Sequence, residues 1–170
     1  ASISPASLRT LLNEIIIHDR RKIVEFGCGI STVHMSKLFD EIGEGHLFFV
    51  ESNADWLEKV ITLVENEGVD RSRYTPIHAH MKKTKIDQKS VQWYDNEAIE
   101  EKLDGAVDMV FVDGPVGHGR AEDTLARFPA LPFMYSYLEE DYVVFLDDVR
   151  REDESRIANM WSERYELAYS

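Results

Sequence analysis

The chain has 170 residues, 44% of them hydrophobic, which is enough for one domain with a substantial core and too little for two. Its formal net charge of −13 and pI near 4.8 give a surface that repels polyanions, so neither nucleic acid nor an anionic membrane is an expected partner. Cys28 is the only cysteine, which excludes an internal disulfide and agrees with a cytoplasmic protein. We therefore treat residues 1–170 as a single domain and leave a homodimer open, and no apolar run approaches the roughly 18 residues of a membrane span.

The chain opens on a predicted helix, because Ser4 can cap it and Pro5 suits the first helical position. Its buried stripe is predicted at Leu8, Leu11, Leu12 and Ile15. Residues 22–26 then form a short apolar run, which is typical of a strand covered on both faces of a parallel sheet.

A glycine turn follows this strand. Gly27 and Gly29 have no Cβ, so the backbone there can turn sharply and come close to a ligand. The next helix can be capped by Ser31 or Thr32, and its apolar positions are Met35, Leu38, Phe39 and Ile42. The unit is therefore a strand, a glycine turn and a helix.

A second strand over residues 46–50 ends in Glu51. The helix after it is capped by Asn53 or Asp55 and buries Leu57, Val60, Ile61 and Val64. Residues 74–79 form a weaker third strand, and Pro76 is tolerated there only near an edge. This strand is therefore predicted at the margin of the sheet.

The middle of the chain is harder to interpret. Residues 81–105 are polar and weakly periodic, and only a short helix around residues 99–103 is predicted in them. Residues 107–112 are the clearest apolar run of the chain and form a fourth strand that ends at Asp113.

Prolines interrupt the helical pattern that follows Arg120, so we expect a short helix, a break and a second helix over residues 132–138. A fifth strand over residues 142–146 ends in Asp147 and Asp148. A helix with Ile157, Met160 and Trp161 comes next, and residues 166–170 can start a sixth strand.

Alternating strands and helices predict an α/β fold with a mostly parallel, doubly wound sheet in three layers. Ligands of such sheets bind beyond the carboxyl ends of the strands. The unusual residues of this chain all follow predicted strand ends: Gly27, Gly29, Glu51, His78, His80, Asp113, Asp147 and Asp148. The sequence therefore predicts one crevice at that edge of the sheet.

The ligand of this crevice is predicted to be a nucleoside, because Glu51 stands where an acidic residue binds ribose hydroxyls in nucleotide-binding crossovers. Thr32 replaces the third glycine of the dinucleotide fingerprint, which disfavours a nicotinamide-dependent oxidoreductase. Glu25 adds a carboxylate beside the turn, which suits an amino group and a sulfonium cation better than a pyrophosphate. S-adenosylmethionine fits this description.

Residues 25–32 (EFGCGIST), Glu51 and residues 110–115 (VFVDGP) together resemble a class I S-adenosylmethionine-dependent methyltransferase. Within that superfamily, residues 127–131 (RFPAL) and 145–148 (FLDD) are similar to a group of small prokaryotic methyltransferase-like domains. The resemblance implies a Rossmann-like sheet of seven strands, the last of them antiparallel. The sequence as given ends at Ser170, so we expect this last strand to be lacking.

The resemblance also implies the roles of individual residues. Glu25, Gly27 and Gly29 would face the methionine part of the cofactor, Glu51 its ribose, and the region of Ser52 and residues 78–80 its adenine. The expected cofactor-binding set is Glu25, Gly27, Gly29, Thr32, Glu51, Ser52, His78, Ala79 and Asp113.

Methyl transfer needs alignment of the acceptor with the sulfonium and a base for the acceptor's proton. The catalytic candidates are Asp113 and His118, whereas His80 is expected to pack beside adenine. The acceptor is predicted between residues 114–120 and 81–105, where Lys82, Lys83, Trp93 and Tyr94 favour an anionic or sugar-like molecule. The alternative is a solvated lysine run with Trp93 buried in a local core.

Asp113, Asp147 and Asp148 resemble the magnesium site of catechol and caffeoyl-CoA O-methyltransferases, and three carboxylates suit a hard divalent cation. Asp148 departs from that family, in which the last ligand is usually Asn. The alternative is that Asp113 orders its loop and Asp147 caps the next helix.

We therefore predict S-adenosylmethionine-dependent methyl transfer to a small-molecule or sugar-derived acceptor, at oxygen. Two alternatives stay open: a module that binds the cofactor without turnover, and a magnesium-dependent catechol-type O-methyltransferase.

Overall fold

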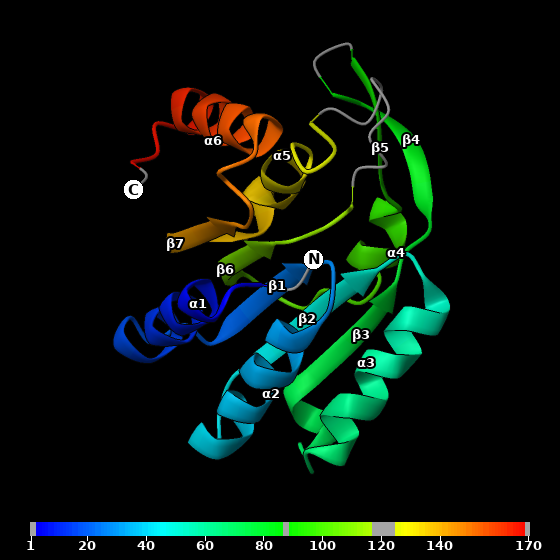
Figure 1. The fold of residues 1–170 in the computed structure, drawn as a ribbon, viewed down its shortest axis with the longest axis vertical. Coiled ribbons are helices and arrows are strands. Elements are labelled where there is room, and N and C mark those ends of the chain that lie inside the picture. Colours follow the sequence, from blue (N-terminus) through cyan, green and yellow to red (C-terminus); the bar gives the residue numbers. More distant parts are fainter. Residues whose placement is uncertain (1–2, 87–88, 117–124, 169–170) are drawn as a thin grey trace.

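The structure is a computed structural model that describes residues 3–86, 89–116 and 125–168. A parallel sheet of five strands forms its middle layer, in the order β3-β2-β1-β6-β7 (Figure 1). The strands are β1 (Lys22–Phe26), β2 (His46–Glu51), β3 (Tyr74–His78), β6 (Val107–Val112) and β7 (Leu138–Leu146). The predicted α/β class and the marginal position of the third strand are both confirmed.

Helices cover both faces of this sheet (Figure 1). One face carries α1 (Pro5–Ile17), α2 (Ile30–Ile42) and α3 (Ala54–Asn66). The other carries α4 (Asn96–Glu100), α5 (Ala130–Met134) and α6 (Glu152–Tyr165). Two short 3-10 turns, η1 (Arg71–Arg73) and η3 (Tyr135–Tyr137), precede β3 and β7. The three predicted layers are therefore present.

Side-chain alternation along β1 shows how the two cores are divided. Ile23 packs with the helices of the α1–α3 face, whereas Val24 and Phe26 pack with those of the other face. Glu25 alternates with Val24 and Phe26, so it points toward the α2 side of the sheet. A carboxyl group is thereby placed inside the protein, beneath the first turn of α2.

The helix starts follow the predicted capping residues at two of three positions. Ser4 and Asn53 accept hydrogen bonds from backbone N–H groups at the starts of α1 and α3. For α2 the prediction of a Ser31 or Thr32 cap is wrong, because the capping position is Gly29. Both side chains instead turn inward, toward the buried carboxyl group of Glu25.

The largest error of the sequence interpretation concerns residues 81–105. They contain an antiparallel hairpin, β4 (Met81–Ile86) and β5 (Lys89–Tyr94), which projects beyond the end of the main sheet (Figure 1). The short helix of this segment is α4, a few residues earlier than predicted. The hairpin was missed because its lysines, threonine and glutamine hide the alternation of a strand.

Two smaller corrections concern the last third of the chain. The helix predicted over residues 132–138 is α5 followed by η3, and β7 begins at Leu138. Glu166 ends α6 in a left-handed conformation, and residues 167–168 form no strand. In the described part of the chain, no helix is both long and apolar enough to cross a membrane.

Candidate active site

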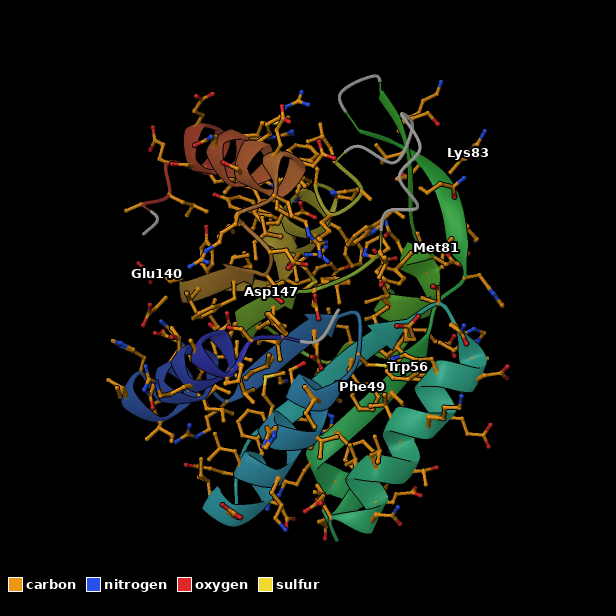
Figure 2. The ribbon with its side chains drawn as sticks, in the orientation of Figure 1. Phe49, Trp56, Met81, Lys83, Glu140 and Asp147 are labelled. Atoms are coloured by element: carbon orange, nitrogen blue, oxygen red, sulfur yellow. The ribbon has the colours of Figure 1, made fainter. Side chains whose placement is uncertain are left out.

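A cleft of about 1140 Å³ lies at the carboxyl ends of the strands, as the fold predicts for a ligand site. Figure 2 shows Trp56, Met81 and Asp147 around this edge, whereas Glu140 lies toward the opposite end of β7. The residues that line this cleft include Gly27, Cys28, Gly29, Glu51, Ser52, Trp56, Met81, Gln92, Tyr94, Asp113, Gly114, Pro115, Val116, Arg127, Asp148 and Arg151.

The turns that follow β1 and β6 touch each other through their backbones. Gly27 has a φ of +83°, and a Cβ on it would lie 2.7 Å from the Gly114 nitrogen and 2.8 Å from its Cα. Phe26 fixes the contact, because its carbonyl accepts hydrogen bonds from Asp113 N (2.9 Å) and Gly114 N (2.7 Å). Gly27 is therefore required by the neighbouring turn rather than by a ligand.

Gly29 is the glycine that faces the cleft. A Cβ added to it would meet no atom within 4 Å, and its φ of −177° is open to any residue. Its N–H donates to Thr32 Oγ1 at 2.9 Å, so Thr32 acts on the turn from behind. The free space at Gly29 is available to a ligand.

Glu25 is fully buried and is not among the cleft-lining residues, so a direct contact with a ligand, as the resemblance implies, is not part of this geometry. Its carboxyl group accepts hydrogen bonds from Ser31 Oγ and, at 2.6 Å, from Thr32 Oγ1. Burial raises the pKa of Glu25 to about 8; the two hydroxyl donors lower it, and the charge of Asp113 adds to the increase. Glu25 therefore holds the first turn of α2 against the strand.

Glu51 lies at the cleft with one carboxylate oxygen fixed by the backbone. Oε1 accepts hydrogen bonds from the N–H groups of Ser52 and Asn53, both at 2.8 Å. Oε2 has no hydrogen bond from a described residue and remains available to a ligand. Trp56 then ties α3 to the glycine turn, since its indole N–H donates to the Cys28 carbonyl at 2.9 Å.

Two predicted cofactor residues do not line the cleft. His78 is exposed, its Nε2 lies 3.0 Å from the Ser52 carbonyl, and its ring packs edge-on against His80. Ala79 is completely buried in the core. The hairpin supplies the cleft wall instead, through Met81, Gln92 and Tyr94.

The hairpin lysines do not form the predicted anion-binding wall. Trp93 is 1% exposed and packs on Phe26 with ring centroids 5.0 Å apart, so it belongs to the core, as the alternative interpretation holds. Lys82 forms an ion pair with Asp95 at 2.7 Å. Lys82 and Lys83 are exposed and are not among the cleft-lining residues. The lysines therefore give no support for an anionic acceptor.

Asp113, Asp147 and Asp148 gather at the other end of the cleft. Each offers a carboxylate oxygen, and these oxygens lie within 4.8 Å of one another, so the predicted convergence is confirmed. Burial raises the pKa of Asp113 to about 7; Arg127 lowers it, and the charges of Asp147 and Asp148 raise it further. Asp147 does not cap α6, because the capping position is Arg151.

Arg127 is the residue of this cluster that the sequence interpretation missed. Its Nη2 lies 3.5 Å from both Asp113 Oδ1 and Asp148 Oδ2. A guanidinium cannot lose its proton, so the cluster already holds a permanent cation. The candidate metal ligands Asp113, Asp147 and Asp148 therefore already have a positive charge beside them.

Other lining residues were also missed, for two different reasons. Arg127 lies inside the RFPAL motif, but nothing in a single sequence indicates that its side chain turns toward three acids. Gln92 lies on a hairpin that was not predicted, whereas Tyr94 of the same hairpin was named at the acceptor side. His118 and Arg120, predicted at the acceptor side, lie outside the described residues.

The comparisons with known proteins agree with this geometry. The family model described as "Methyltransferase domain" matches residues 24–149, which is most of the chain. The chain therefore belongs to this family of methyltransferase domains. The resemblance stated from the sequence is confirmed. The comparison with curated proteins finds no match.

Solved structures share the fold at low sequence identity. The O-methyltransferase from Bacillus cereus in complex with SAH is 16% identical, with a TM-score of 0.67 over 96% of this chain and 70% of that one. TomG, an O-methyltransferase from Streptomyces achromogenes involved in tomaymycin synthesis and solved with SAM, is 14% identical, with a TM-score of 0.67 over 98% and 71%. SAH-bound PaMTH1 from Podospora anserina is 13% identical, with a TM-score of 0.63 over 97% and 70%.

The contrast between the two glycines gives a stability prediction. Gly27→Ser should destabilise the fold by about 2 kcal/mol or more, because it forces a positive φ and a clash with the Gly114 backbone. Gly29→Ser should change stability by less than about 0.5 kcal/mol, since serine suits a helix cap. Urea unfolding of both variants tests this, and equal losses would contradict the assignment.

The buried carboxyl of Glu25 gives a pH prediction. Its folded pKa of about 8 exceeds the ordinary 4.5, so its contribution to stability is complete below pH 4.5 and is lost as the pH rises to about 8. Glu25→Gln removes this pH-dependent loss. From pH 5 to pH 8, the free energy of unfolding of the variant should therefore rise by roughly 2 to 4 kcal/mol relative to that of the wild type. Urea unfolding across this range measures it, with exposed Glu65→Gln as control. Parallel pH profiles for Glu25→Gln and the wild type would refute the buried acid.

Proposed function

We propose that the protein transfers a methyl group from S-adenosylmethionine to a hydroxyl oxygen of a small molecule. The observation that carries the proposal is the single cleft in which an open glycine turn, a strand-end carboxylate with a free oxygen and an aspartate cluster lie together. Membership in the methyltransferase family supports the reaction class. The similar fold of O-methyltransferases solved with SAH or SAM supports oxygen as the acceptor atom.

The cofactor would lie along the cleft from the glycine turn to the hairpin. Gly29 leaves space for the methionine part, and Glu51 Oε2 is free to accept a hydrogen bond from a ribose hydroxyl. Met81 and Tyr94 offer an apolar and an aromatic wall of the kind that a purine packs against. Glu25 and Thr32 act indirectly, by fixing the turn on which the cofactor would rest.

Bound S-adenosylmethionine supplies a methyl group on a positively charged sulfur. The acceptor oxygen would take this methyl group as the carbon–sulfur bond breaks, with S-adenosylhomocysteine as the leaving group, and a base would take the acceptor's hydroxyl proton. Asp113 is the proposed base, because it lines the cleft and its pKa of about 7 suits proton uptake near neutral pH. The cleft volume of about 1140 Å³ leaves room for a small acceptor beside the cofactor.

The acceptor class follows from the walls near Asp113. Val116 and Pro115 give an apolar side, while Asp148 and Arg151 give a polar one. A small hydroxylated molecule, including a sugar-derived one, matches such a mixed wall. Binding without turnover is one alternative, and it differs from the proposal only in whether an acceptor is methylated.

Glu51→Ala tests the cofactor site. The change removes the carboxylate that would bind the ribose, and the dissociation constant for S-adenosylhomocysteine should rise about 10- to 150-fold, as for a hydrogen bond to a charged group. Calorimetric titration measures this, with Asp55→Ala as the matched control on the exposed first turn of α3. An unchanged constant for Glu51→Ala would remove the ribose assignment.

Asp113→Asn tests the base. Methyl transfer to the best of a panel of hydroxylated small molecules should fall about 10²- to 10⁴-fold, while S-adenosylhomocysteine affinity changes much less. Exposed Asp104→Asn is the control and should keep full activity. Full activity of Asp113→Asn would exclude it as the base. Tight cofactor binding with no methylated product from any acceptor would favour the binding module.

A further inference from the structure

Arg127 is held beside the aspartate cluster by contacts additional to those with the Asp113 and Asp148 carboxylates. It is 3% exposed although it carries a permanent charge. Its Nη1 donates to the backbone carbonyl of Asp147 at 3.1 Å, and its Nε lies 3.8 Å from Glu154 Oε1 on α6. The guanidinium is therefore held in place from behind.

The Nη2 end of the same guanidinium meets the two carboxylates that face the cleft. One nitrogen, Nη2, is equidistant at 3.5 Å from Asp113 Oδ1 and Asp148 Oδ2. A single positive nitrogen thus lies between two of the three groups that a shared cation would need. Of the carboxylates around it, Asp113 and Asp148 line the cleft.

Asp148 provides a second, independent sign of this arrangement. A carboxylate, and not a neutral amide, stands at position 148 beside this guanidinium. Asp148 adopts a φ of +61°, a left-handed conformation that aspartate and asparagine tolerate about equally, so the backbone does not explain the choice. The negative charge of a carboxylate at position 148 compensates the positive charge of the buried guanidinium.

We infer that Arg127 takes the place of a divalent cation in the Asp113–Asp147–Asp148 cluster, so that this site works with an internal guanidinium and binds no metal. A metal would need the Asp113 and Asp148 oxygens within about 2.0–2.6 Å of itself. Those oxygens already flank a positive charge that cannot be neutralised by proton loss. Arg127 thereby gives the cluster one positive charge that proton loss cannot remove.

The inference deepens the proposed function and rests on it for one consequence. A divalent cation takes several oxygen ligands, so it can hold an acceptor through two neighbouring hydroxyls. A site that carries Arg127 does not offer this chelation, so one hydroxyl beside Asp113 is sufficient. The acceptor class is therefore a single alcohol or phenol and need not be a diol.

The test is a direct measurement of Mn²⁺ binding by paramagnetic resonance, which does not depend on activity. The wild type should show no saturable binding up to about 1 mM. Arg127→Met removes the guanidinium from between the two carboxylates. This variant should bind Mn²⁺ at least tenfold more tightly than the wild type. Arg151→Met is the matched control. It also removes one positive charge, which lies 3.0 Å from Asp148, but the Arg151 side chain is 53% exposed. It should change binding less than threefold.

Several results would overturn the inference. These are submillimolar Mn²⁺ binding by the wild type that Asp148→Asn abolishes, no gain in Arg127→Met, or an equal gain in Arg151→Met. If Arg127→Met folds poorly, its thermal unfolding with and without Mn²⁺ decides: the metal should raise its midpoint and leave that of the wild type unchanged. If the wild type binds no S-adenosylhomocysteine, the proposed function is refuted, but the conclusion from the Mn²⁺ measurement still holds.

Discussion

The candidate site depends on the contact between two backbone turns, those of Gly27 and Gly114. No side chain fits between them, so the ends of β1 and β6 are held at van der Waals distance. This contact places Gly29 open to the cleft on one side and Asp113 on the other. The proposed cofactor and acceptor positions meet at this point because the sheet brings the two strand ends together.

Glu25 and Arg127 are both buried near this contact, and their charges are handled in opposite ways. Glu25 is surrounded by hydroxyl groups and stays largely protonated at neutral pH, so it acts as a neutral strut beneath α2. Arg127 keeps its charge and is surrounded by carboxylates and a carbonyl oxygen. Both side chains support the backbone around the cleft. Glu25 holds the first turn of α2, and Arg127 holds the turn that follows β7.

Much of the fold could be predicted from local patterns. Apolar runs located β1, β2 and β6, and Pro76 located the sheet margin, because these signals are carried by neighbouring residues. The convergence of Asp113, Asp147 and Asp148 followed from parallel topology alone. The hairpin over residues 81–94 could not be predicted, since its exposed strands carry polar side chains. Arg127 could not be assigned either, because its partners follow the ends of β6 and β7 or lie on α6, and no spacing in the sequence indicates them.

A crystal structure of the protein with S-adenosylhomocysteine would show whether the cleft holds an S-adenosyl ligand between the glycine turn and Glu51. We expect the ribose hydroxyls within hydrogen-bonding distance of the Glu51 carboxylate and the sulfur on the Asp113 side of Gly29. A ligand bound elsewhere, or one whose ribose lies away from Glu51, would contradict it.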